Sequence, residues 1–227
     1  MDINGVLIID KPEGWTSFDV VAKLRGALRI KRIGHGGTLD PMATGVLPIF
    51  IGTATRLSNT STDATKEYLA GIKLGTITDT QDITGNILSE NEVTVTFDDL
   101  KAILPRFTGP QKQLPPMFSA KKKDGKKLYE LARKGIEVER EPKDIEIFKL
   151  DLENDNQLRV KCSKGTYVRT LCHDIGTALG CGAVMSSLRR LMSGSFKIED
   201  AHTLDTVLRA IDDGVIKNLM YEVHCNV

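Results

Sequence analysis

Apolar runs near the start of the chain predict two strands on either side of a helix. The run at 5–10 stops at Lys11 and Pro12, which indicates a buried strand that ends in a turn. Thr16 or Ser17 is expected to cap the helix that follows, and a second apolar run at 46–51 predicts another strand. The apolar face expected for the helix consists of Phe18, Val21, Leu24 and Leu28, and its solvent face of Lys23, Arg25 and Arg29.

The middle of the chain shows both periodicities. Residues 66–75 alternate apolar and other positions, with Tyr68 on the apolar face, which is typical of a strand. Apolar residues at helical spacing over 97–107 predict a helix that stops or kinks at Pro105. Three further helices are predicted: one in the second half of 119–135 with Gly135 as its C-cap, one at 166–179, and one from a Thr203 cap through 211. Two further strands are predicted at 144–152 and 157–162.

Strands and helices follow one another in mixed order, without the regular alternation of a doubly wound fold. We therefore expect an α+β fold with a mixed, largely antiparallel sheet flanked by helices. The length of 227 residues suits one large domain, or one domain with a small appendage. The segment 33–45, which holds four glycines and a proline, is expected to be a loop with unusual backbone angles.

The composition is that of a folded protein, with 41% hydrophobic and 27% charged residues. No apolar run approaches the roughly 18 residues that a membrane span needs, and the N-terminus lacks the basic start of a signal peptide. The four cysteines are widely and irregularly spaced, so they predict neither a disulfide framework nor a zinc site. We expect a cytoplasmic protein with no membrane association and no metal.

The net charge of +1 conceals a strong segregation of charge along the chain. Residues 20–35 carry five basic residues and no acid, and residues 101–135 carry ten basic and two acidic residues. Residues 74–100 carry six acids and no base. A positive face on a nearly neutral chain is typical of a protein that binds a polyanion, although a single lysine-rich run can also be an ordinary solvated helix face.

The glycine-rich segment 34–45 also carries the most informative candidate chemistry. It lacks the Gly-Lys-Ser/Thr ending of a phosphate-binding loop and the glycine spacing of a dinucleotide site. It does place one carboxylate, Asp40, immediately before Pro41 and after small residues that allow close approach of a substrate. An Asp before a Pro is also common in ordinary turns, so the spacing leaves both interpretations open.

Several long motifs follow one another between about residue 6 and residue 202. In chain order they are GVLIIDKPEGWTS, GHGGTLDPMATGVLP, KEYLAGIKLGTITDTQD, PPMFSAKKKDGKKLYELARKGIEVER, KGTYVRTLCHDIGTALGCGA and SSLRRL. Together they resemble the motifs of the bacterial TruB family of tRNA pseudouridine-55 synthases. The resemblance implies the pseudouridine synthase fold. It also implies isomerisation of uridine to pseudouridine at position 55 in the T-loop of tRNA, by cleavage of the C1′–N1 bond, rotation of the base and formation of a C5–C1′ bond.

The resemblance also implies roles for individual residues. Asp40 matches the catalytic aspartate, as nucleophile or as base, and Arg169 matches the arginine that pairs with it. Tyr68 matches the aromatic residue that stacks on the target base, while Tyr167 and Leu188 match residues that enclose the uracil. Without the motifs, Tyr68 and Leu188 would be assigned to the core and Arg169 equally well to a solvated helix face.

Other matches concern the RNA around the target. His35 matches a histidine that wedges into the RNA loop, and Lys11 and Pro12 match a motif that we expect to support the site. Contacts to the RNA backbone within the basic segment, about 110–135, are expected from Lys121, Lys122, Lys123, Lys126 and Lys127. The expected partner is the T-arm of tRNA, with no obligate protein partner and no cofactor.

Two departures from the family pattern affect these expectations. Position 36 is glycine where the family usually has threonine, and the chain ends soon after its last predicted helix, where most bacterial members continue into a small RNA-binding domain of the PUA type. We expect a catalytic domain at 1–212 and a short C-terminal tail at 213–227. The alternative function is that of a tRNA-binding folding helper with weak or no isomerase activity; a small-molecule phosphate-binding enzyme is a third interpretation.

Overall fold

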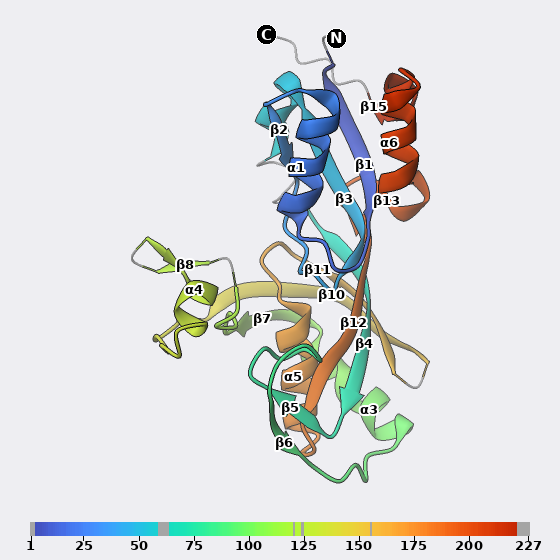
Figure 1. The fold of residues 1–227 in the computed structure, drawn as a ribbon. Helices are drawn as coiled ribbons and strands as arrows, with labels where there is room; N and C mark the ends of the chain where they lie inside the picture. Colours follow the sequence, from blue (N-terminus) through green and yellow to red (C-terminus); the bar gives the residue numbers. More distant parts are fainter. Residues whose placement is uncertain (1–2, 59–63, 120, 124, 155, 222–227) are drawn as a thin grey trace. The chain divides into compact units, whose positions relative to one another are not determined.

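A computed structural model describes residues 3–58, 64–119, 121–123, 125–154 and 156–221, and of Lys122 and Lys123 it describes the backbone alone (Figure 1). The chain divides into two compact units. Unit 1 comprises residues 1–68 and 188–227, and unit 2 comprises residues 69–187. Two strands, β4 (Lys66–Leu74) and β12 (Ala183–Ser193), carry residues of both units.

Unit 1 is built on an antiparallel pair of strands, β1 (Gly5–Lys11) and β3 (Thr44–Ile51), which confirms both apolar runs as strands. β3 also pairs in parallel with the end of β12, at Arg189 and Arg190. Three short strands add to the sheet in this unit. Strand β13 (Phe196–Lys197) pairs with β12, while β14 (His202–Thr203) and β15 (Met220–Tyr221) both pair with β1. Most of these pairs are antiparallel, as expected.

The prediction that all of 33–45 is loop is wrong at both ends. Residues Ile33–His35 form β2, which pairs antiparallel with β3, and Thr44 already belongs to β3. Residues 33–35 form a strand because the backbone N–H and C=O groups at the edge of β3 are available to pair with them. The glycine content of the segment predicts a loop because it does not reflect this distant partner. Unusual backbone angles are confirmed at Gly37 and Gly45, whose φ values are +94° and +100°.

Helix α1 (Ser17–Leu28) begins at a Thr16 cap, as predicted, and α6 (Leu204–Asp212) begins at a Thr203 cap. Both contribute to an apolar core with β1 and β3 that includes Val20, Leu24 and Val207. The predicted apolar face of α1 is wrong in one respect, because Phe18 is 62% exposed. The short 3-10 helices of this unit are η1 (Gly52–Leu57), η3 (Ile198–Asp200) and η4 (Ile216–Leu219).

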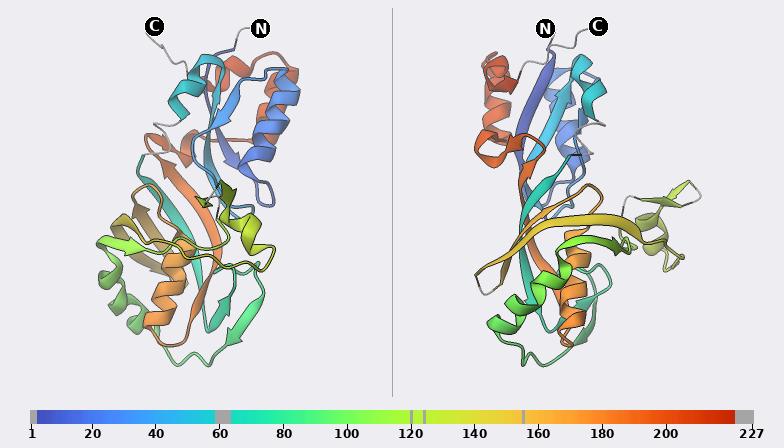
Figure 2. Two further views of the ribbon diagram at one scale, coloured as in Figure 1. Left: turned by 90° about the vertical axis from the view of Figure 1, so that its left-hand side faces the viewer. Right: turned by 180° about the vertical axis from the view of Figure 1, so that it is seen from behind.

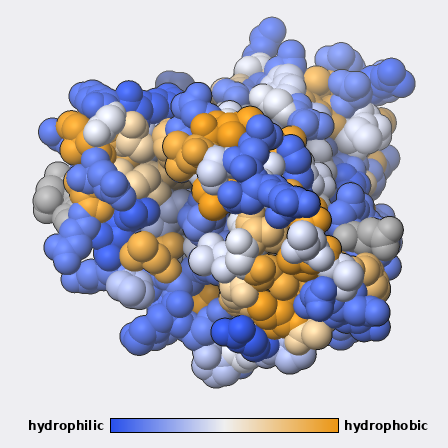
Figure 3. Space-filling view, turned by 90° about the horizontal axis from the view of Figure 1, so that it is seen from below, coloured by the Kyte–Doolittle hydropathy of each residue, from blue (hydrophilic) through white to orange (hydrophobic). Residues whose placement is uncertain are grey.

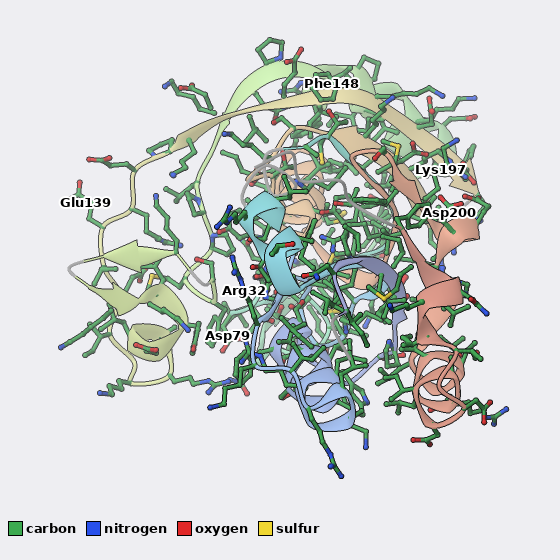
Figure 4. The ribbon with its side chains drawn as sticks, turned by 90° about the horizontal axis from the view of Figure 1, so that it is seen from above. Arg32, Asp79, Glu139, Phe148, Lys197 and Asp200 are labelled. Carbon is green, nitrogen blue, oxygen red and sulfur yellow. The ribbon has the colours of Figure 1, made fainter. Side chains whose placement is uncertain are left out.

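The positions of the short elements of unit 1 are fixed by side chains as well as by strand pairing. Arg32, labelled in Figure 4, donates from Nε to the Thr55 hydroxyl at 2.7 Å and so connects the start of β2 to η1. Lys197 and Asp200, labelled in the same figure, are joined by a hydrogen bond from the Lys197 N–H to the Asp200 carboxylate. The expected boundary at residue 212 stays a prediction.

Unit 2 contains the strand order β12-β4-β11-β10-β7, where β7 is Gly109–Gln113, β10 is Lys143–Asn154 and β11 is Gln157–Cys162. Its β10–β11 and β10–β7 pairs are antiparallel, and the first of them confirms the two strands predicted at 144–152 and 157–162. Two further antiparallel pairs are β5 (Thr76–Thr78) with β6 (Ile87–Glu90) and β8 (Lys122–Lys123) with β9 (Lys126–Lys127).

The helices of unit 2 follow the sequence pattern closely. Helix α3 (Phe97–Ile103) gives way to the 3-10 helix η2 (Leu104–Phe107) at Pro105, which confirms the predicted stop. Helix α5 (Val168–Ala178) begins after Tyr167. The basic segment forms the β8–β9 hairpin and then helix α4 (Leu128–Ala132). Both elements lie in the connection between the end of β7 and the start of β10 (Figure 2).

The observed class is α+β with a mixed, largely antiparallel pairing of strands, as expected. Apolar side chains gather on the face of unit 2 that Figure 3 shows from below; exposed apolar residues near β5 and β6 include Ile83, Ile87 and Leu88. Among the described residues, none of the helices has the length and apolar character that crossing a membrane requires.

Candidate active site

In unit 1, Asp40 lies on the loop between β2 and β3. Its carbonyl oxygen accepts a hydrogen bond from the Ala43 N–H at 3.0 Å, which closes a turn around Pro41 and Met42. Asp40 is half-buried. The turn interpretation of Asp-Pro is therefore confirmed for the backbone. Gly36, the first residue of this loop, is buried and donates its N–H to the Pro48 carbonyl at 2.8 Å.

The loop is anchored on both sides of Asp40 by the segment 11–17. The Leu39 N–H donates to the buried Ser17 hydroxyl at 2.9 Å. On the other side, the Pro41 carbonyl accepts from the Gly14 N–H at 2.9 Å and from Lys11 Nζ at 3.2 Å. A carboxylate held on a backbone that is fixed one residue before it and one residue after it has little freedom to drift, which suits a reacting group.

Lys11 is fully buried, and its ammonium donates to three carbonyl oxygens. Besides Pro41, these belong to Pro12 at 2.8 Å and Trp15 at 2.6 Å. Burial lowers the pKa of Lys11 to about 8; the negative charge of Asp40 opposes this shift and the positive charge of Arg190 adds to it. Lys11 therefore supports the loop, as expected, and also places a titratable cation near Asp40.

Arg190 connects three parts of unit 1. It is 1% exposed, its Nε donates to the Val46 carbonyl at 2.7 Å, and its Nη2 donates to the Gly37 carbonyl at 3.2 Å. Burial lowers the pKa of Arg190, while a side-chain hydrogen bond with Tyr68 opposes that shift. Gly45 is required beside it, because a Cβ there would lie 2.2 Å from the Arg190 carbonyl oxygen.

Tyr68 and Leu188 are placed in the same unit, and each is nearly buried at 8% and 9% exposure. His35 ends β2 and is half-buried. Burial, and secondarily the positive charge of Arg190, lowers the pKa of His35, so its imidazole is neutral at pH 7. Unit 1 thus contains Asp40, Tyr68, Leu188 and His35, with Arg190 hydrogen-bonded to Tyr68 and to the loop of Asp40.

Arg189, next to Arg190 on β12, makes a bidentate ion pair with Asp10 at the end of β1. The two N–O distances are 3.1 and 2.8 Å, and Nη1 also lies 3.2 Å from the Thr44 hydroxyl. Reasoning from single residues missed Arg189 and Arg190. The signal was present in the quoted SSLRRL motif, of which only Leu188 was assigned a role.

In unit 2, Tyr167 and Arg169 stand at the start of α5. Two hydrogen bonds with the buried Gln113 side chain hold the Tyr167 backbone, at 2.7 Å to its N–H and 3.0 Å to its carbonyl. The Arg169 guanidinium carbon lies 6.0 Å from the centroid of the Tyr167 ring. Arg169 is 6% exposed, which rejects a solvated helix face for it, and its Nη2 donates to the Phe118 carbonyl at 2.7 Å.

Asp82 is the buried acid of unit 2 that sequence reasoning missed. It is 3% exposed, and its Oδ2 lies 3.5 Å from Arg169 Nη1. Its other oxygen accepts from the Thr80 hydroxyl at 2.9 Å and from the Thr84 N–H and hydroxyl at 2.9 and 2.6 Å. The motif that carries Tyr68 ends at this residue. The expected pairing of Arg169 with Asp40 stays a prediction, because the two residues belong to different units.

The basic segment of unit 2 presents its cations around a tight hairpin. Gly125, with φ +79°, lies between the two strands, and Lys126 is exposed. Tyr129 stands between two cations, because Lys127 Nζ and the Arg133 guanidinium carbon each lie 5.4 Å from its ring centroid. Lys121 is half-buried, and the side chains of Lys122 and Lys123 lie outside the described part of the structure.

A half-buried carboxylate that interacts with a buried cation, as Asp40 does with Lys11, is suited to acid–base or nucleophilic chemistry. Within the described ranges, no group of three or more His, Cys, Asp or Glu side chains is arranged to hold a metal ion. Cys172 offers no second nucleophile, because burial raises its thiol pKa to about 12.

Comparison with family models connects this geometry to a known group of enzymes. Residues 25–168 match the model of the TruB family pseudouridylate synthase (N terminal domain), and residues 169–219 match that of the tRNA pseudouridylate synthase B C-terminal domain. The first match covers Asp40, Tyr68, Tyr167 and the basic segment. The second covers Arg169, Leu188 and the two arginines of β12.

Individual relatives agree with the family models. A protein named tRNA pseudouridine synthase B from Syntrophomonas wolfei is 50% identical over 91% of this chain and 72% of its own length. Another of that name, from Opitutus terrae, is 49% identical over 91% of this chain and 88% of its own length.

Solved structures provide a second comparison. A Cbf5-Nop10-Gar1 complex contains a chain that is 32% identical, with a TM-score of 0.75 over 96% of this chain. An H/ACA RNP bound to a substrate RNA containing 2′-deoxyuridine is 31% identical, with a TM-score of 0.68 over 92%. This chain spans 59% and 55% of the length of those chains. Sequence motifs, fold and relatives all agree, and this chain belongs to the TruB family of pseudouridylate synthases.

Proposed function

We propose that this chain isomerises uridine 55 in the T-loop of tRNA to pseudouridine, acting in the cytoplasm without an obligate protein partner. The observation that carries the proposal is the anchored Asp40 loop of unit 1, where the buried Lys11 ammonium, which donates to the Pro41 carbonyl, also interacts electrostatically with the half-buried Asp40 carboxylate. An isomerisation leaves the atoms of the nucleoside unchanged, so the reaction needs no redox partner, group donor or cofactor.

Asp40 assists cleavage of the C1′–N1 bond, either by attack as a nucleophile or by removal of a proton from the ribose. Both roles require the ionised carboxylate, which interacts favourably with the positive charge of Lys11. The fixed loop backbone supports either role by keeping the carboxylate in place while the detached uracil turns.

The target base is enclosed by aromatic and apolar side chains. Tyr68 stacks on the flipped uracil, and its burial among neighbouring side chains holds the ring in place while the base rotates. Leu188 and Tyr167 complete the enclosure. Arg169 supplies positive charge to the Asp40 carboxylate, as the family resemblance implies, and His35, neutral at pH 7, fills the space that the base leaves in the RNA loop.

The RNA backbone is contacted by the basic segment of unit 2. Lys121, Lys122, Lys123, Lys126 and Lys127 neutralise phosphates of the T-arm, which supplies affinity without reading the sequence. Selection of the target uridine then depends on flipping and on the fit of the base in its pocket.

The test is incubation of the chain with unmodified tRNA, followed by carbodiimide mapping of pseudouridine. We expect modification at position 55 by the wild type and none by Asp40→Asn, which should still bind tRNA within about tenfold of wild-type affinity because the lost group does not contact phosphates. Asp213→Asn, an exposed acid after α6, is the matched control and should retain activity.

Two results would contradict the proposal. Near wild-type modification by Asp40→Asn would remove this residue from the mechanism. Tight tRNA binding by the wild type without any pseudouridine would instead favour the folding-helper function.

A further inference from the structure

The first turn of α1 is attached to the loop that carries Asp40. The Ser17 hydroxyl accepts from the Leu39 N–H at 2.9 Å and lies 3.4 Å from the Leu39 carbonyl oxygen, to which it donates. Ser17 is buried, and Leu39 immediately precedes Asp40. Phe18 follows Ser17 directly. Its backbone is therefore held next to the residue that bonds the proposed catalytic loop.

Phe18 is a large apolar side chain that the fold leaves in solvent, with 62% of its surface exposed. The guanidinium carbon of Arg25 lies 5.9 Å from the centroid of its ring. Arg25 is itself held by a hydrogen bond of 2.6 Å from Nη2 to the Ile33 carbonyl. The ring is therefore supported by a fixed cation and presents most of its area to a ligand.

The cation of Arg25 lies beside this ring, and the segment 20–35, to which Arg25 belongs, has no acid. Its exposed cations are Lys23, Arg29, Lys31 and Arg32. The nearest acid in sequence, Asp19, accepts hydrogen bonds from the Thr16 N–H at 2.9 Å and the Thr16 hydroxyl at 2.6 Å, as part of the helix cap. An exposed aromatic ring among cations has the chemistry of a single-stranded nucleic acid contact, in which a base stacks and phosphates are neutralised.

We propose that Phe18 is a stacking platform for an unpaired RNA base that neighbours the target uridine, with Arg25 supporting the ring. The inference rests on the proposed function, because it places the base of a flipped-out loop next to the Asp40 loop. It adds a nucleotide contact in unit 1 that differs from the basic segment, since stacking is largely independent of salt while lysine contacts to phosphate are strongly salt-dependent.

The experiment measures RNA binding in the Asp40→Asn background, so that the RNA is bound without being converted. The probe is a T-arm stem-loop with 2-aminopurine at a loop position beside the target uridine. Phe18→Ala, Phe18→Leu and Phe18→Tyr are compared at several salt concentrations. Phe148→Ala is the matched control, because Phe148 on β10 is 45% exposed and lies in unit 2 (Figure 4).

We expect Phe18→Ala and Phe18→Leu to raise Kd about tenfold at every salt concentration, with an unchanged slope of log affinity against log salt. Phe18→Tyr should retain both affinity and quenching of the 2-aminopurine, and Phe148→Ala should behave as the parent. Because Phe18 is exposed, its variants should keep the melting temperature of the parent.

The stacking role would be overturned if both Phe18→Ala and Phe18→Leu bound the stem-loop with the affinity of the Asp40→Asn parent and quenched the 2-aminopurine fluorescence as strongly. That result would leave the proposed function intact. A loss of affinity that appears only at low salt would also overturn the stacking role, since it would indicate a phosphate contact. Failure of the Asp40→Asn parent to bind the stem-loop at all would count against the proposed function itself.

Discussion

At the scale of single residues, unit 1 buries two cations, Lys11 and Arg190. Lys11 has no exposed surface and Arg190 is 1% exposed, although burying an unpaired charge costs several kcal/mol. Carbonyl oxygens offset that cost, three around Lys11 and two around Arg190, together with the Tyr68 hydrogen bond. The same hydrogen bonds that make the charges tolerable also fix the backbone on both sides of the Asp40 loop.

Lys11→Met should destabilise the protein by about 2 kcal/mol at pH 7.5, because three buried carbonyl oxygens lose their donor. The difference should widen with pH. The pKa of Lys11 is about 8 in the folded state and 10.5 ordinarily, so the folded protein releases the proton first and the wild-type unfolding free energy rises between these values. Urea unfolding at pH 7.5 and 9.5 measures both effects. A difference that stays constant with pH would show that Lys11 does not titrate in this range.

At the scale of elements, the proposed function assigns different tasks to the Asp40 loop and to the β8–β9 hairpin. The Asp40 loop is hydrogen-bonded to the segment 11–17 and to β3. The β8–β9 hairpin is closed by its own strand pairing and by the hydrogen bond from the Leu128 N–H to the Lys121 carbonyl at 2.8 Å. A reacting carboxylate needs fixed geometry, while phosphate contacts depend mainly on charge. The two elements are suited to these different tasks.

Changing Lys122, Lys123 and Lys126 together to alanine should weaken RNA binding most at low salt. Each lost phosphate contact should reduce the slope of log affinity against log salt by somewhat under one unit, through counterion release. Turnover at saturating RNA should survive. The control changes Lys197, Arg209 and Lys217, cations of the acid-rich C-terminal segment, and should leave the slope unaltered. An unchanged slope in the hairpin variant would move the RNA-binding face elsewhere.

At the scale of the whole molecule, the boundary between the units falls inside two strands rather than in linkers. Residues 68 and 69 are neighbours within β4, and residues 187 and 188 are neighbours within β12. Domains that unfold independently are usually joined by exposed, flexible segments. We therefore expect one cooperative unfolding transition for the chain.

Trp15 makes that expectation measurable, because it is the single tryptophan and belongs to unit 1. Its fluorescence should report the same urea midpoint as far-UV circular dichroism, which reports both units. A control protein with Trp15→Phe and Phe148→Trp should report that midpoint from unit 2. Midpoints that differ between the two probes would show that the units unfold separately.

The sequence by itself determined the elements with strong periodicity or clear caps, the family and the candidate Asp40. Local sequence pattern was enough to predict strands β1 and β3, the helix caps at Thr16 and Thr203, and the end of α3 at Pro105. The motifs were enough to identify the family, because long motifs in this order are specific to it.

Tertiary structure alone decided which polar residues are buried and what they contact. The pairing of Ile33–His35 with β3, the exposure of Phe18 and the partners of Arg190 and Asp82 all depend on segments distant in sequence. A glycine-rich segment becomes a strand only where an edge is available, and an arginine becomes a buried support only where distant carbonyls surround it. Local pattern contains none of that information, because these hydrogen bonds are formed across the fold rather than along the chain.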